Sequence, residues 1–169
     1  MWTALIKSEM EQAFHATQGL MDLVDDDAMA WKPSDGENWM STGELLRHLT
    51  NACGWCSEQF VNDSWAAAMQ SGGMDESAVS SAAEAKAALA EDHARGVAAI
   101  EKAGEEALAS RMMPAPWDPT ERPLGQHVLQ MVSHLQQHKA QLFYYLKLQG
   151  KPVNTFTMWG IAEPPAANP

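Results

Sequence analysis

Four stretches of this chain repeat apolar residues at the spacing of an α-helix, and this pattern restricts the possible fold more than any other feature. Strand-like alternation of apolar and polar residues is almost absent. We expect helices at about 2–24, 42–70, 76–104 and 123–149. Amphipathic helices without strand partners must bury their apolar faces against one another, so the sequence predicts an all-α fold, a four-helix bundle.

Capping and helix-breaking residues set the expected ends of these helices. Ser41 and Glu44 form a capping-box pattern, and Gly150 followed by Pro152 ends the last helix. The connections between helices one and two (25–40) and between helices three and four (105–122) are long. The sequence leaves open whether consecutive helices are neighbours or whether a connection crosses over.

Size and charge limit the class of protein. With 169 residues, 46% hydrophobic and 20% charged, the chain is expected to form a single globular domain over 1–169, with 162–169 as a loose tail. A net charge of −11 argues against nucleic acid and anionic membranes as partners. No apolar run approaches the roughly 18 residues of a membrane span, and no secretory signal is recognisable, so we expect a cytoplasmic protein.

Three histidines form the best candidate for a functional site. His134 and His138 are four residues apart in an expected helix, so their imidazoles leave the same face one turn apart. His48, in the second helix, is expected to point inward as well. Three imidazoles suit one divalent metal ion and leave a coordination position open for chemistry. The alternative is that each histidine is separately hydrogen-bonded or half-exposed.

The residues around these histidines resemble the DinB-like family of metal-binding four-helix bundles. The resemblance lies in His134 to Pro152 and in Trp31 to Leu49, and it covers the element order of almost the whole chain. It implies one divalent ion, often nickel or zinc, on His48, His134 and His138. The family often has Arg and Gly where this chain has Lys139 and Ala140; lysine lacks the planar guanidinium fork, which puts an anion-binding role at this position in doubt.

Two residues near the histidines are candidates for a supporting role. Glu44 lies one turn before His48 and is a possible hydrogen-bond acceptor for it, although it is also the capping residue. Gln141 lies about one turn after His138 and is the other candidate to support the metal-binding histidines from behind the ion or to reach its open coordination position.

The remaining histidines and the tryptophans receive weaker assignments. His127 is expected to be exposed or to lie near the site, and His15 and His93 receive no role. Tryptophans in the two long connections are expected either to pack simply or to form an apolar pocket mouth at one end of the bundle: Trp31, Trp39 and Trp117.

The motif Cys53-Gly-Trp-Cys56 looks like a redox pair, but we interpret it as core filling. Redox use needs the first cysteine at a helix N-terminus, whereas here the pair is expected in the middle of a helix. Cys56 is also eight residues beyond His48, which is roughly 12 Å along a helix axis.

Two functions follow from these features. The first is a metalloenzyme; the resemblance implies thiol-dependent transferase or isomerase chemistry with a low-molecular-weight thiol, and hydrolysis comes next. The second is a non-catalytic metal-binding or stress-related protein. The Ala-rich 76–104 helix suggests a homodimer. The sequence does not identify a substrate.

Overall fold

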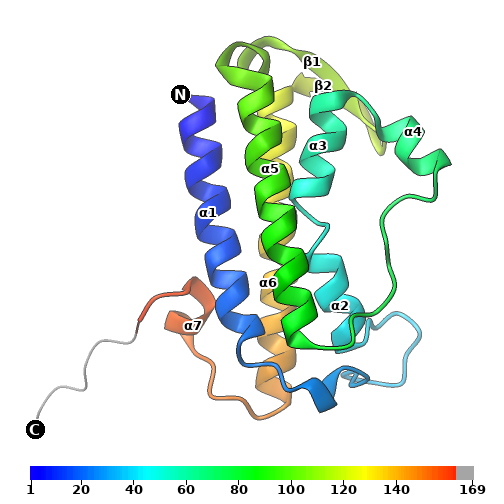
Figure 1. Cartoon of the computed structure of the whole chain (residues 1–169), viewed down its shortest axis with the longest axis vertical. Coiled ribbons are helices and arrows are strands. Elements are labelled where there is room, and N and C mark those ends of the chain that lie inside the picture. Colours follow the sequence, from blue (N-terminus) through cyan, green and yellow to red (C-terminus); the bar gives the residue numbers. More distant parts are fainter. Residues whose placement is uncertain (163–169) are drawn as a thin grey trace, which may run out of the picture.

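Three long helices run side by side in the structure, namely α1 (Trp2–Met21), α5 (Ala82–Ser110) and α6 (Leu124–Leu148) (Figure 1). Next to them, α2 (Thr42–Leu49) and α3 (Gly54–Asn62) follow one another along the molecule. The structure is a computed structural model that describes residues 1–162. The expected loose tail lies almost entirely outside these residues.

The remaining elements lie in the connections between these helices and in the segment after α6. These are η1 (Asp26–Ala28), α4 (Trp65–Gln70), β1 (Met112–Ala115), β2 (Asp118–Pro123) and α7 (Thr155–Trp159). Within residues 1–162, no helix combines the length and the apolar character needed to cross a membrane.

The core lies between the long helices and the α2–α3 segment. Both α1 and α3 pack against α5 and α6, and α2 packs mainly against α6. Therefore α1 and the α2–α3 segment lie diagonally opposite each other in the molecule. The connection between them crosses the end of the molecule instead of joining neighbouring helices. Fully buried side chains come from every wall of this core, and their transfer from water is the main stabilising contribution: Ile6, Met10, Leu45, Phe60, Ile100 and Leu135.

Two of the expected helices are confirmed closely, and a third only in part. The ranges 2–24 and 123–149 correspond to α1 and α6. The expected helix 76–104 begins later, because Ser81 caps it by accepting a hydrogen bond from the backbone N–H of Glu84. Its predicted end coincides with a non-helical residue, Gly104 (φ +69°), beyond which helical structure continues to Ser110.

The expectation of one continuous helix over 42–70 is wrong. The chain leaves the helix after Leu49, where the side chains of Thr50 and Asn51 both donate hydrogen bonds to the carbonyl oxygen of Arg47. Such local side-chain bonds compete with helix continuation. The chain breaks again after α3, where Asp63 adopts a left-handed conformation (φ +54°).

A buried carboxylate closes the break between α2 and α3. Asp92, on α5, accepts hydrogen bonds of 2.7 Å from the backbone N–H groups of both Gly54 and Trp55, the first residues of α3. Residue 54 must be glycine at this close approach, since a Cβ atom there would lie 1.8 Å from the carbonyl oxygen of Asp92. Burial raises the pKa of Asp92 to about 6, although the two backbone donors act in the opposite direction.

The expected 105–122 connection contains a β-hairpin that the sequence did not predict. Strands β1 and β2 pair antiparallel, with Met112 opposite Pro123 and Ala115 opposite Asp118. Prolines are tolerated because a two-stranded hairpin leaves half of its backbone N–H groups unpaired. Since β2 runs directly into α6, the hairpin is fixed to the upper end of that helix (Figure 1).

We expect Asp92→Ala to lower the free energy of unfolding by about 2–4 kcal/mol, because it leaves two buried N–H groups without an acceptor. Chemical denaturation measures this change. Asp22→Ala, which removes an exposed ion pair with Lys86, is the control and should cost at most about 1 kcal/mol. Equal losses in the two variants would show that the cap contributes no more than a surface ion pair.

Candidate metal centre

The three histidines that the sequence selected come together in the structure. His48 lies in the last turn of α2, and His134 and His138 lie on successive turns of α6. The Nε2 atom of His134 is 3.2 Å from Nε2 of His48 and 3.1 Å from Nε2 of His138. All three side chains are half-buried, and one nitrogen of each lies within 4.8 Å of the others.

The break between α2 and α3 provides a hydrogen-bond partner for His134. The carbonyl oxygen of Ala52, which lies in the break, is 3.1 Å from Nδ1 of His134. A carbonyl oxygen only accepts hydrogen bonds, so Nδ1 carries the ring proton and donates it. In the neutral ring, Nε2 of His134 is therefore an unprotonated lone pair.

A chain of hydrogen bonds makes the same assignment for His138. The Tyr145 hydroxyl donates to the carbonyl oxygen of Met40 (2.9 Å) and accepts from Nε2 of Gln141 (3.2 Å). This orients the Gln141 amide so that its Oε1 faces Nδ1 of His138 at 3.1 Å. In the neutral ring, the proton of His138 is therefore on Nδ1, and Nε2 carries a lone pair.

These proton positions make the site suitable for a cation. The Nε2 lone pairs of His134 and His138 face each other at 3.1 Å, an arrangement that repels unless a positive charge lies between them. A tetrahedral ion with metal–nitrogen bonds of about 2.0–2.1 Å places its nitrogen ligands about 3.3 Å apart. The two separations that involve His134, 3.1 and 3.2 Å, are close to this value, and one nitrogen of each of the three rings lies within 4.8 Å of the others, so the donor set can hold a divalent metal.

Burial favours the neutral, metal-binding form of the imidazoles of His48 and His134. Burial, followed by the neighbouring His138 and His134, lowers the pKa of His48 to about 4. Burial and His138 also lower the pKa of His134, while its bond to Ala52 acts in the opposite direction. Both rings are therefore neutral at pH 7.

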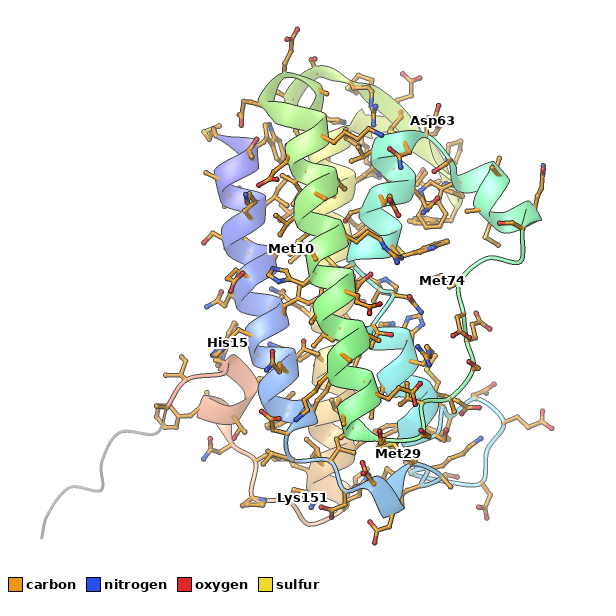
Figure 2. The ribbon with its side chains drawn as sticks, viewed as in Figure 1. Met10, His15, Met29, Asp63, Met74 and Lys151 are labelled. Carbon is orange, nitrogen blue, oxygen red and sulfur yellow. The ribbon has the colours of Figure 1, made fainter. Side chains whose placement is uncertain are left out.

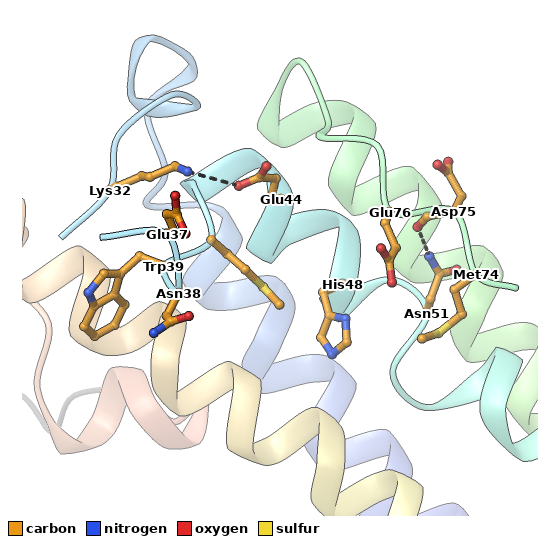
Figure 3. A pocket seen from close by; sticks show the side chains of 11 residues that line it. Lys32, Glu37, Asn38, Trp39, Glu44, His48, Asn51, Met74, Asp75 and Glu76 are labelled. Atoms are coloured by element: carbon orange, nitrogen blue, oxygen red, sulfur yellow. Dashed lines mark hydrogen bonds and ion pairs between the residues drawn. The ribbon is translucent and has the colours of Figure 1, made fainter. Parts of the chain in front are cut away.

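Two pockets adjoin the triad, and they differ in character. The first, of about 400 Å³, includes His48 and has a mainly charged and polar wall with Lys32, Glu44 and Glu76 (Figure 3). The second, of about 490 Å³, includes His134 and has a mainly apolar wall. Met74, in the connection after α4, borders both (Figure 2).

The two candidate supporting residues have different surroundings. Gln141 contacts His138 directly. Glu44 accepts a hydrogen bond of 2.6 Å from the backbone N–H of Ser41 and completes the predicted capping box. It lines the same pocket as His48, but a hydrogen bond from His48 to Glu44 stays a prediction.

The sequence did not predict the hydrogen-bond partners Ala52 and Tyr145 of the candidate centre, and it gave a wrong environment for His127. The Ala52 carbonyl was not foreseen because the helix break was not. Tyr145 lies on the same helical face as His138 and Gln141, which was a usable signal. The expectation that His127 is exposed is wrong: it is 1% exposed, stacks on Phe60 and donates a 2.8 Å hydrogen bond to the carbonyl oxygen of Met113 in the hairpin.

The tryptophans do not gather at one pocket mouth. Trp39 lines the polar pocket and Trp117 the apolar one, while Trp31 packs edge-on against Tyr145. His134 lies near the middle of α6, so the two pockets adjoin the triad partway along that helix rather than at an end of the molecule.

The expectation that both cysteines lie in the middle of a helix is also wrong, because Cys53 immediately precedes α3. Burial nevertheless raises the pKa of both thiols, that of Cys53 well above its usual range and that of Cys56 to about 12. The nearby Asp92 carboxylate acts in the same direction. Thiols held in this form are poor nucleophiles, which favours the core-filling interpretation.

Comparison with known proteins gives a family and a fold. The family model described as the DinB superfamily matches residues 9–142. The crystal structure of a DinB-like protein from Bacillus subtilis, YjoA, is similar with a TM-score of 0.65 and 23% sequence identity, over 90% of this chain and 97% of that chain. This likeness concerns the fold alone. No curated protein matches the chain.

We expect the protein to bind about one divalent ion per chain and His134→Ala to lose most of it, because the central nitrogen of the triad is removed. Elemental analysis after loading with zinc or nickel and desalting measures this. His15→Ala is the matched control, since that ring lies away from the triad and contacts the carbonyl oxygen of Gly160. Equal metal content in wild type and His134→Ala would refute the assignment.

We expect the double variant Cys53→Ala, Cys56→Ala to keep its ion. In the wild-type protein, both thiols should react with a disulfide reagent at least about a hundredfold more slowly than free cysteine at pH 7, because so little thiolate is present. Elemental analysis and thiol titration test the two statements. Loss of the ion in the double variant would favour a mixed cysteine and histidine site instead.

Proposed function

The chain belongs to the DinB superfamily, and we propose that it is a metalloprotein holding one divalent ion, nickel or zinc, on His48, His134 and His138. The observation that carries this proposal is the convergence of Nε2 lone pairs from His134 and His138 at 3.1 Å. We also infer that α1, α5, α6 and the α2–α3 segment constitute the four-helix bundle of this family, with the broken segment acting as its second helix.

We propose further that the ion is catalytic. Three protein ligands leave at least one coordination position for water or substrate, and two pockets lead to the triad. When bound, the ion supplies a Lewis acid that favours the deprotonated form of a thiol or a water molecule. Gln141 and the Ala52 carbonyl hold the ring protons of His138 and His134 at Nδ1, which keeps both Nε2 atoms available.

The leading reaction class is thiol-dependent transfer or isomerisation with a low-molecular-weight thiol, and hydrolysis is the next. The polar pocket supports it, because Lys32, Asn38 and Asn51 offer hydrogen bonds to a small polar thiol. Glu37 and Glu76 line the same pocket (Figure 3). Their carboxylates are candidates to accept the proton that the thiol or water releases.

A non-catalytic metal-binding or stress-related role is the alternative. In that case the ion would mainly hold α2 to α6, and its removal by a chelator would strongly destabilise the protein. The homodimer and the cytoplasmic location stay predictions.

We expect the nickel-loaded protein to develop a near-ultraviolet sulfur-to-metal charge-transfer band when 2-mercaptoethanol is added, because an ion held by three histidines would leave a coordination position for the added thiolate. Absorption spectroscopy measures the band. His134→Ala, treated in the same way, should show none. A fully loaded wild-type protein that shows no band would mean that no position is open to a thiol, and would favour the non-catalytic role.

A further inference from the structure

The apolar pocket lies between α4, the β1–β2 hairpin, α3 and α6, and of these elements the sequence failed to predict the hairpin. One part of its wall comes from α4 and the connection after it, and a neighbouring part from the turn of the β1–β2 hairpin; Figure 1 shows both at the α3 side of the molecule. Its apolar wall consists of two indoles, three thioethers and a proline: Trp65, Met69, Met74, Pro116, Trp117 and Met131.

Aromatic contacts fix this wall. The rings of Trp65 and Trp117 meet edge to face, with centroids 5.5 Å apart and planes at 85°. Phe60, fully buried on α3, makes edge contacts with both, at 5.2 and 5.9 Å. The indoles are therefore held from behind, while Trp117 is still 54% exposed and available to a ligand.

The pocket borders the proposed metal site, and its lining is unfavourable for charged groups of a ligand. His134 lies in its lining, and Gln130 and Gln137 supply the side-chain amides there. Among the described residues, its lining contains no aspartate, glutamate, lysine or arginine, whereas the polar pocket on the His48 side contains four carboxylates, those of Glu37, Glu44, Asp75 and Glu76. A volume of about 490 Å³ is typical of a small-molecule site.

We propose that the apolar pocket holds the aromatic or short hydrocarbon body of the substrate, while a polar head on the same molecule reaches the triad. The substrate class is thus a small molecule with a flat apolar body, which fits within a pocket of about 490 Å³, and one metal-binding head. This rests on the proposed metal centre. Aromatic and thioether side chains gain the most from contact with a flat apolar ring, which assigns the body to this pocket rather than to the acidic one.

Two hydroxamic acids separate the contribution of the head from that of the body. Acetohydroxamate carries the metal-binding head alone, and 2-naphthohydroxamate adds the apolar ring. With zinc-loaded full-length protein, calorimetric titration should give at least about tenfold tighter binding for the naphthyl compound, because its ring is removed from water.

Matched tryptophan variants locate the ring. Trp117→Ala should abolish most of the difference between the two compounds, since it removes the exposed indole of the apolar pocket. Trp39→Ala removes an indole of similar exposure (42%) from the acidic pocket and should leave the difference within twofold. Circular dichroism of both variants checks that the fold is kept.

The outcomes distinguish the apolar pocket from the metal centre. Equal affinities of the two compounds for the wild-type protein would overturn the proposal, as would a larger effect of Trp39→Ala than of Trp117→Ala. Metal dependence is tested with His48→Ala, because His48 does not line the apolar pocket. If His48→Ala binds 2-naphthohydroxamate as tightly as the wild-type protein does, and this binding still depends on Trp117, the metal centre is refuted. The apolar pocket would then still be a ligand site.

Discussion

The two hydrogen bonds from the start of α3 to the buried Asp92 carboxylate determine how the candidate centre is assembled. A helix that stops and restarts in a protein interior leaves backbone groups without partners, and each of these is costly. Asp92 satisfies the N–H groups at the restart, and Gly54 allows α5 to come close enough for it to do so. The break can then persist next to α6, where an uninterrupted helix would have used the Ala52 carbonyl internally.

The Ala52 carbonyl, which is not used within a helix, sets the orientation of one histidine of the candidate centre. A histidine ring next to a backbone acceptor has one favourable tautomer, and the ring of His134 is consequently held with Nε2 toward its two neighbours. The second ring on α6 is held in the same tautomer by a different route, through Gln141 and Tyr145 to the carbonyl of Met40. The connection before α2 and the break after it thus each orient one ring. Rigid orientation of this kind reduces the rearrangement that ion binding requires.

The sequence predicted the helices and residues that are specified by a periodic apolar pattern or by local capping residues. It failed for the segments whose conformation is determined by tertiary contacts. The apolar stripe and Gly150 were sufficient to define α6, and the spacing of His134 and His138 was sufficient to pair them. The placement of His48 beside them also followed from its position on an inward face. By contrast, the restart of the helix at Gly54 depends on the Asp92 carboxylate, 38 residues further along the chain. The prolines in β1 and β2 argued against strands, so the hairpin was not predicted. Because His127 is buried against this hairpin, its burial was not predicted either.

Helices carry the three histidines and connections form much of the pocket walls, which has a consequence for how proteins with this fold can evolve. The three imidazoles are carried by α2 and α6, whereas α4, the hairpin turn and the 71–81 and 22–41 connections supply much of the walls of the two pockets. Insertions and substitutions in surface connections are tolerated far better than changes in packed helices. Gene duplication followed by drift in these connections would therefore yield proteins that share one metal centre and accept different molecules.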